Sequence, residues 1–210
     1  MAQKLIFIRH GCAQGAKAGT FVGRTDLPLS PEGVEQARKL VPAVLAAKPG
    51  ACYCSPLLRA RQTSEILLKN AGLSVQFDDD LREIDFGRWE CKTFEEITAE
   101  DPYGQAARAV KRWATFDHRF AFPGGESLGG FLARMRRSAR RLSEDPAPTV
   151  LVVTHGGIIR AMICHFLGLR PRQYVLFHIA HAACTVIDLY DGHGVLGGLN
   201  VPCISTTKTT

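Results

Sequence analysis

The chain has 210 residues, which is enough for one domain with a full hydrophobic core. Its formal net charge is +6, a basic balance that suits nucleic acid, acidic lipid or small anionic substrates as partners. No apolar stretch approaches the ~20 residues of a membrane span, so we expect no membrane partner.

Much of the excess positive charge lies between Leu132 and Leu142, where five arginines follow a helical pattern. Apolar residues recur on one side of this segment at the helical period, and the arginines occupy the rest of its surface. A solvated outer face is the simplest interpretation. Because no aromatic platform or nucleic-acid-binding motif accompanies the charge, we expect no nucleic-acid partner.

The cysteines and the amino terminus bear on the cellular compartment. The seven cysteines are scattered and show no paired Cys-x-x-Cys spacing, which favours free thiols in a reducing compartment. The first predicted strand begins within the first five residues, which leaves no room for a signal sequence. These observations predict a cytoplasmic protein.

Predicted strands and helices alternate along the chain. Apolar or β-branched runs predict strands at 5–8, 51–54, 75–77, 150–154, 183–190 and 195–199. Cap signals and helical periodicity predict helices that open at 30–31 and 55–56, a helix over 93–116 broken at Pro102, an arginine-rich helix over 128–142 and an apolar helix over 158–167. We expect the acidic run at 78–80 to be a solvent-facing loop and 204–210 to be a flexible tail.

This alternation predicts an α/β fold, a three-layer α/β/α sandwich around a mainly parallel sheet. No internal repeat, linker or shift in composition marks a second domain, so 1–210 is interpreted as a single domain. The segment at about 93–130 is interpreted as a small helical cap inserted over the carboxyl edge of the sheet.

Two of the predicted strands end in the same way, at His10-Gly11 and at His155-Gly156-Gly157. Ligands bind in parallel sheets where strands end and the chain turns towards a helix. A neutral imidazole can act as a nucleophile, and guanidinium groups such as those of Arg9 and Arg59 match phosphate oxygens. The pattern therefore favours a phosphoryl-binding pocket. The remaining histidines lack such neighbours and are interpreted as structural or surface residues: His118, His165, His178, His181 and His193.

Five ordered blocks of the chain resemble the motifs of the histidine phosphatase superfamily, in the branch that contains cofactor-dependent phosphoglycerate mutases. The blocks are Arg9-His10-Gly11, Gly23 to Leu29 with Gly33 and Gln36-Ala37, Ser55 to Ala60 with Gln62-Thr63, Leu81-x-Glu83 with Gly87-x-Trp89-Glu90, and Thr154 to Gly157. Two positions depart from the family pattern: Cys12 stands where a glutamate or similar polar residue is usual, and Cys91 where a glycine is common.

The resemblance implies a role for each matched residue. His10 would attack phosphorus and become a phosphohistidine, and Glu83 would act as the general acid and then the general base. Arg9, Arg59 and His155 would hold the phosphoryl oxygens. The resemblance implies further substrate contacts at Gly11, Gly23, Arg24, Thr25 and Gly156. It implies neither a metal nor another cofactor.

The substrate class is narrowed by the short segment between Glu83 and His155, since mutases of this family carry a longer cap there. The segments 85–90, 94–97 and 123–128 resemble the α-ribazole phosphatase subgroup, which implies hydrolysis of α-ribazole 5′-phosphate in cobalamin assembly. Other small phosphomonoesters, a mutase-like activity and a non-catalytic phospholigand-binding protein remain open as alternatives.

Gly125 to Gly129 also match the Gly-x-Ser-x-Gly elbow of serine hydrolases, but no buried strand directly precedes them. The partner is expected to be a small phosphorylated substrate, and a homodimer is left open.

Overall fold

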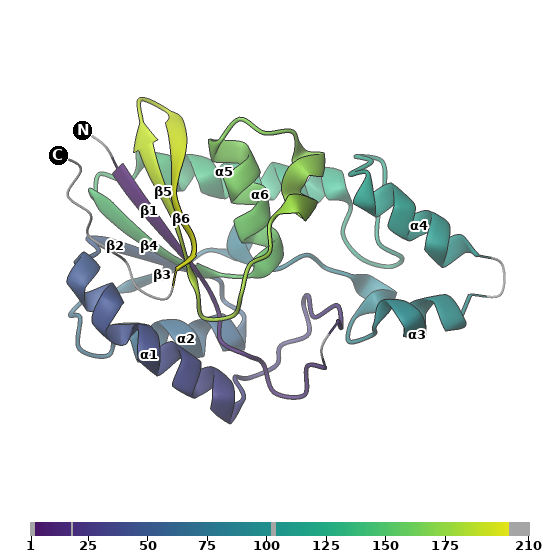
Figure 1. Cartoon of the computed structure of the whole chain (residues 1–210), viewed down its shortest axis with the longest axis horizontal. Helices are drawn as coiled ribbons and strands as arrows, with labels where there is room; N and C mark the ends of the chain where they lie inside the picture. Colours follow the sequence, from purple (N-terminus) through teal and green to yellow (C-terminus); the bar gives the residue numbers. More distant parts are fainter. Residues whose placement is uncertain (1–2, 18, 102–103, 202–210) are drawn as a thin grey trace.

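The computed structural model describes residues 3–17, 19–101 and 104–201 (Figure 1). The predicted tail at 204–210 and the predicted break at Pro102 lie outside these residues. Within the described ranges, no helix is both long and apolar enough to cross a bilayer.

A six-stranded mixed sheet forms the centre of the molecule (Figure 1). In spatial order it contains β3 (Val75–Phe77), β2 (Ala51–Cys54), β4 (Thr149–Thr154), β1 (Gln3–Arg9), β5 (Cys184–Tyr190) and β6 (His193–Val201). The strands from β3 to β1 run parallel, and β5 and β6 add an antiparallel edge. The prediction of a mainly parallel sheet is confirmed.

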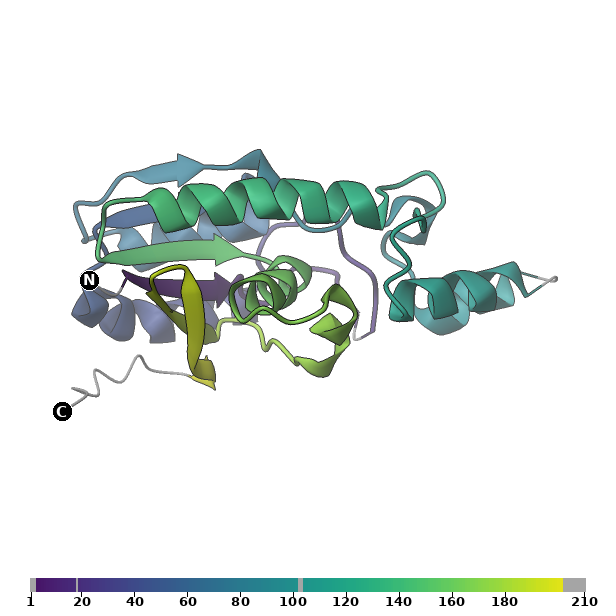
Figure 2. The same ribbon diagram turned by 90° about the horizontal axis from the view of Figure 1, so that it is seen from above.

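Helices cover both faces of the sheet, which confirms the three-layer prediction (Figures 1 and 2). On one face lie α1 (Pro31–Ala47) and α2 (Leu58–Leu68), and on the other lie α5 (Leu128–Glu144) and α6 (Gly156–Phe166). Side chains alternate along β1, so that Leu5 and Phe7 join the core under α5 and α6 while Ile6 and Ile8 join the core under α1 and α2.

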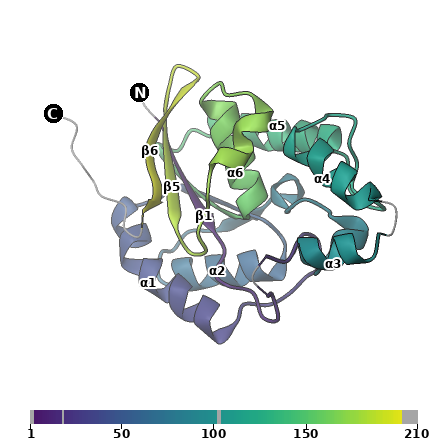
Figure 3. The same ribbon diagram turned by 45° about the vertical axis from the view of Figure 1, so that its right-hand side comes forward.

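Two short helices, α3 (Phe94–Ala99) and α4 (Gln105–Ala114), lie beyond the sheet at the end to which β1 and β4 point (Figures 2 and 3). They are attached through 3-10 turns, Asp79–Leu81 and Gly87–Trp89, and a further turn, Pro171–Leu176, follows α6. Six aromatic rings in edge or tilted contact join this cap to the body of the molecule: Phe21, Phe86, Trp89, Trp113, Phe120 and Phe122.

The two predicted helix starts have different outcomes. Ser30 caps α1 as expected, because its Oγ accepts a hydrogen bond from the amide of Gly33 at 3.0 Å. The second prediction was wrong: α2 begins at Leu58, and Ser55 does not cap it. The chain stays extended after β2 instead, and Ser55 is buried at the end of the sheet.

The interpretation of the arginine-rich helix also needs correction. Its apolar stripe packs into the core as predicted, with Phe131, Met135 and Ala139 buried. Arg134, however, is only 6% exposed and points into the protein. The acidic run is not a free loop either, because the carboxylates of Asp78 and Asp80 form ion pairs with arginines of α5.

We predict that Gly11→Ala lowers the free energy of unfolding by about 1–3 kcal/mol through overpacking. A Cβ at position 11 would lie 2.3 Å from the carbonyl oxygen of Gly33, where the end of β1 meets the start of α1. Denaturant unfolding followed by circular dichroism measures the change. Gly129→Ala is the matched control, since its Cβ would come no closer than 3.4 Å to His118; equal stability of the two variants would contradict the prediction.

Candidate active site

The register between β1 and β4 places the two predicted histidines side by side. Arg9 pairs with Thr154 across these parallel strands, so His10 and His155 both follow at the same edge of the sheet. The amide of His10 also donates to the carbonyl of Thr154 at 3.0 Å. The two imidazole rings consequently lie 5.0 Å apart between centroids, at an interplanar angle of 61°.

Two hydrogen bonds define the tautomer of His10. Nδ1 lies 2.7 Å from the carbonyl oxygen of Gly11, which can only accept, so Nδ1 carries the proton. Nε2 lies 3.1 Å from Nε of Arg59, which can only donate, so Nε2 presents its lone pair. His10 is thus held as a neutral imidazole whose Nε2 lone pair accepts a hydrogen bond from the Arg59 guanidinium.

Arg59 is the largest fully buried side chain among the described residues. Besides its bond to His10, its guanidinium donates to the carbonyls of Thr25 at 2.9 Å and of Gly23 at 2.7 Å. No carboxylate lies in ion-pair contact with it among the residues described. Its positive charge is therefore not neutralised by a direct ion pair.

His155 is completely buried and is held by Ser55, whose Oγ lies 2.7 Å from Nε2. Its Nδ1 is buried and has no hydrogen-bond partner among the described residues. The chain stays extended after β2, and this brings Ser55 to His155. Because Ser55-Pro56 is also a typical helix start, the sequence did not predict this contact.

Burial is the main cause that lowers the pKa of both His10 and His155 well below the ordinary value of 6.5. The charge of Arg59 acts in the same direction on both rings, followed by Arg9 on His10. Both imidazoles are therefore neutral near pH 7. Burial also lowers the pKa of Arg9 to about 10, with Glu83 opposing the shift, so this side chain stays protonated. Its Nη1 donates to the carbonyl of Ile179.

Glu83 lies at the same edge and is 8% exposed. Its carboxylate accepts hydrogen bonds from the amide of Gly157 at 2.9 Å and from its neighbour Ile84 at 3.0 Å. A Cβ at position 157 would lie 2.3 Å from Glu83 Oε1, so only glycine allows this approach to the start of α6. The structure thus brings together Arg9, His10, Arg59, Glu83 and His155, which lie up to 146 positions apart.

Gly23 and Thr25, two predicted substrate contacts, bind a neighbouring carboxylate in the structure. Their amides, together with that of Arg24, donate to the carboxylate of Glu90 at 2.9–3.1 Å, and the Thr25 hydroxyl donates to it at 2.7 Å. These groups are consequently engaged in shaping the loop. Nε of Arg24 donates to the carbonyl of Glu83 at 3.1 Å.

The two predicted glycine contacts also have structural roles. The amide of Gly11 donates to Thr63 Oγ1 at 3.3 Å. At Gly156, a Cβ would lie 3.4 Å from Nε of Arg9, so this glycine admits the guanidinium close to the start of α6.

His181 was interpreted as a structural or surface residue, but the structure places it in the site. Its ring lies 5.3 Å from that of His10, and its Nδ1 lies 3.1 Å from the carbonyl of His10. Burial lowers its pKa to about 4, with Arg9 contributing. No motif signals this residue, because it reaches the site only through the loop that precedes β5.

Both departures from the family pattern border the site. Cys12 is held by Gln36, whose side-chain oxygen accepts from the Cys12 amide at 2.9 Å. Cys91 has a φ of 60°, in the left-handed region that favours glycine. This backbone conformation explains why glycine is common at that position.

The model of the histidine phosphatase superfamily (branch 1) matches residues 5–202. The chain is 30% identical over 199 residues to the adenosylcobalamin/alpha-ribazole phosphatase of Escherichia coli K12, covering 94% of this chain and 95% of the relative. It is 31% identical over 207 residues to phosphoserine phosphatase 1 of Hydrogenobacter thermophilus, covering 95% and 93%.

The fold is similar to the crystal structure of the alpha-ribazole phosphatase from Shigella flexneri, with a TM-score of 0.84, 29% identity and coverage of 97% of this chain and 98% of that one. Together with the two histidines, the buried arginines and the carboxylate at one edge of the sheet, these matches show that the chain belongs to the histidine phosphatase superfamily, a group of phosphatases and mutases that act through a phosphohistidine.

Proposed function

We propose that the protein is a metal-independent phosphomonoesterase in which His10 is the nucleophile. The observation that carries the proposal is the tautomer of His10, whose Nε2 lone pair faces the pocket of positive charge at Arg59. In the first step Nε2 forms a bond to phosphorus as the bond from phosphorus to the alcohol oxygen breaks. That oxygen takes a proton from the carboxylic acid of Glu83.

In the second step water attacks the phosphohistidine and gives a proton to Glu83, while the nitrogen–phosphorus bond breaks and phosphate leaves. Arg9, Arg59 and His155 hold the phosphoryl oxygens through both steps. Burial and backbone carbonyls already fix the two guanidinium groups, and Ser55 fixes His155. The contact that the attack must break is the hydrogen bond from Arg59 Nε to His10 Nε2. Losing one such pre-placed donor typically costs about 2.7–4 kcal/mol of transition-state stabilisation.

As substrate we propose α-ribazole 5′-phosphate. The support is the likeness to the Escherichia coli and Shigella flexneri proteins, together with the segments of the cap that resemble the same subgroup. The small cap of α3 and α4 favours hydrolysis over a mutase reaction, which needs a phosphoenzyme shielded from water. Phosphoserine is the second candidate, because a phosphoserine phosphatase of similar identity covers the same length.

Two alternatives from other classes are less well supported. The serine of the Gly-x-Ser-x-Gly match, Ser127, caps α5 by accepting from the amide of Gly130 at 3.0 Å, so it is engaged in a helix cap. A non-catalytic binding protein would have no need of both a nucleophile and an acid. Localisation in the cytoplasm stays a prediction, with which the free thiols among the described cysteines agree. A homodimer also stays a prediction.

His10→Ala tests the proposed reaction. We expect turnover of p-nitrophenyl phosphate to fall to background and no phosphoenzyme to be trapped on acid quenching with labelled substrate, because the attacking nitrogen is gone. His118→Ala, at an exposed position, is the control and should retain wild-type turnover. A His10→Ala rate near wild type would reject the mechanism.

The pH profile tests the electrostatics of the site. Protonation of His10 removes the nucleophile, and its pKa is lowered well below 6.5, so lowering the pH from 7 to 6.5 should cause no loss of kcat/KM through this protonation. Arg59→Gln removes a cation that lowers the pKa of His10, so the acid limb of its remaining activity should move to higher pH. A limb that moves to lower pH would contradict this assignment.

The substrate proposal is tested by comparing kcat/KM for α-ribazole 5′-phosphate, phosphoserine and 3-phosphoglycerate. We expect at least about tenfold preference for the nucleotide, the scale of discrimination that one extra set of pocket contacts gives. Isomerisation of 3-phosphoglycerate is assayed in parallel. A preference for phosphoserine would favour the second candidate, and isomerisation would indicate a mutase.

A further inference from the structure

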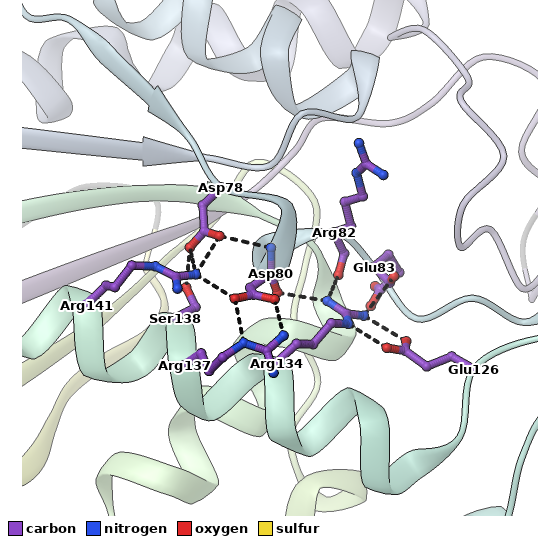
Figure 4. A network of polar contacts seen from close by, with 9 residues as sticks. All are labelled: Asp78, Asp80, Arg82, Glu83, Glu126, Arg134, Arg137, Ser138 and Arg141. Carbon is purple, nitrogen blue, oxygen red and sulfur yellow. Dashed lines mark hydrogen bonds and ion pairs between the residues drawn. The ribbon is translucent and has the colours of Figure 1, made fainter.

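Arg134 is a buried cation outside the proposed phosphoryl pocket (Figure 4). It lies on α5, and its guanidinium reaches the segment that carries Glu83. Nη1 donates to the carbonyls of Asp80 at 2.8 Å and of Arg82 at 2.5 Å. Nη2 donates to the carbonyl of Glu83 itself at 3.0 Å.

The remaining donors of Arg134 go to the carboxylate of Glu126. Nε bonds one oxygen at 2.6 Å and Nη2 bonds the other at 2.9 Å. All five N–H groups of the guanidinium are therefore used, in the fork geometry that only arginine provides. A lysine at this position would offer three donors from a single point.

Glu126 forms hydrogen bonds to the same segment at Asp85, on the C-terminal side of Glu83. Its amide donates to the carbonyl of Asp85 at 2.9 Å, and its Oε2 accepts from the amide of Asp85 at 3.4 Å. Arg24, from the loop near the pocket, is the second guanidinium on the Glu83 carbonyl. Hydrogen bonds thus hold the backbone at Arg82, at Glu83 itself and at Asp85. The side chain of Glu83 points to Gly157.

Stability alone does not account for this arrangement. A buried ion pair is often replaced by packed apolar residues without loss of stability, because both charges must be desolvated. What an apolar pair could not supply is the three directed hydrogen bonds from Arg134 to the carbonyls of Asp80, Arg82 and Glu83 on one loop. The network therefore matters chiefly for where that loop lies.

We infer that Arg134, with Glu126 as its counterion, is a positioning residue that holds Glu83 at the distance needed for proton transfer to the leaving oxygen. The inference rests on the proposed role of Glu83 as general acid. It also gives a role to two sequence features that the phosphoryl pocket does not use, the arginine-rich helix and the Gly-Glu-Ser segment at 125–127.

The test uses a series of substituted phenyl phosphates, from p-nitrophenyl to p-methoxyphenyl. These substrates have similar shape, but their leaving groups differ in how much they need a proton. kcat/KM reports the step that forms the phosphoenzyme. The slope of log(kcat/KM) against the pKa of the leaving group therefore measures how much the acid contributes, and a steeper slope means less proton donation. The variants are Arg134→Lys, Arg134→Ala and Glu126→Gln, with Arg137→Gln as the matched control. Arg137 lies on the same helix and bonds only the Asp80 side chain among the loop residues.

For Arg134→Ala we expect kcat/KM to fall about 100-fold with the p-methoxyphenyl ester and less than about threefold with the p-nitrophenyl ester, as a misplaced acid predicts. Arg134→Lys and Glu126→Gln should show the same steeper slope at smaller amplitude, and Arg137→Gln a wild-type slope. Thermal unfolding by circular dichroism selects the folded variants; should Arg134→Ala not fold, the two milder variants decide the matter.

Equal losses across the series, or no loss, in folded Arg134→Lys and Glu126→Gln would overturn the inference. Glu83→Gln separates this failure from failure of the proposed function. When Glu83→Gln steepens the slope and the Arg134 variants do not, Glu83 is the acid and Arg134 does not position it. When Glu83→Gln leaves the slope unchanged, the assignment of Glu83 as acid fails.

Discussion

The pairing of β1 with β4 is the constraint on which the site depends. Both strands are buried on two faces and run parallel, so their carboxyl ends meet at one edge of the sheet. The register that aligns Arg9 with Thr154 is enforced by the alternation of Leu5, Ile6, Phe7 and Ile8 between two cores. A shift of one residue would reverse every one of these side chains. The separation of His10 and His155 is therefore set by the packing of the core.

Positive charge in the pocket is held by neutral partners. Arg59 and Arg9 donate to backbone carbonyls and to an imidazole rather than to carboxylates. Carbonyl dipoles orient the guanidinium groups without cancelling their charge, and burial keeps the nearby imidazoles neutral. A site of this kind suits a dianionic phosphoryl group and leaves His10, the proposed nucleophile, unprotonated. The same charge would favour attack, because it stabilises oxygens that gain charge in the transition state.

The carboxylates near the pocket serve a different purpose. Glu90 gathers the amides of the loop at 23–25, and Glu126 binds Arg134 beneath the segment that carries Glu83. Each of these carboxylates lies outside the pocket and holds in place a loop that contributes to it. Both loops lie between the sheet and the cap, where strands no longer impose a backbone geometry. Hydrogen bonds to a carboxylate take over that function at the loop 23–25, and the Arg134–Glu126 ion pair does so beneath Glu83.

The sequence by itself determined the α/β class, the mainly parallel sheet and the position of Arg9, His10 and His155 at one sheet edge, because apolar runs and strand-end motifs are local signals with a known geometric consequence. That Arg59 and Glu83 join them was implied by the resemblance to the family. Other features were decided only by the tertiary structure. Ser55 reads locally as a helix cap but bonds His155, His181 arrives through a loop with no motif, and Arg134 belongs to a pattern typical of a solvated face. In each case the partner lies 51 or more positions away, and its carbonyl, ring or hydroxyl leaves no mark on the neighbouring sequence. Local periodicity shows which side of a helix or strand is apolar, but only the packed chain shows which polar group meets another.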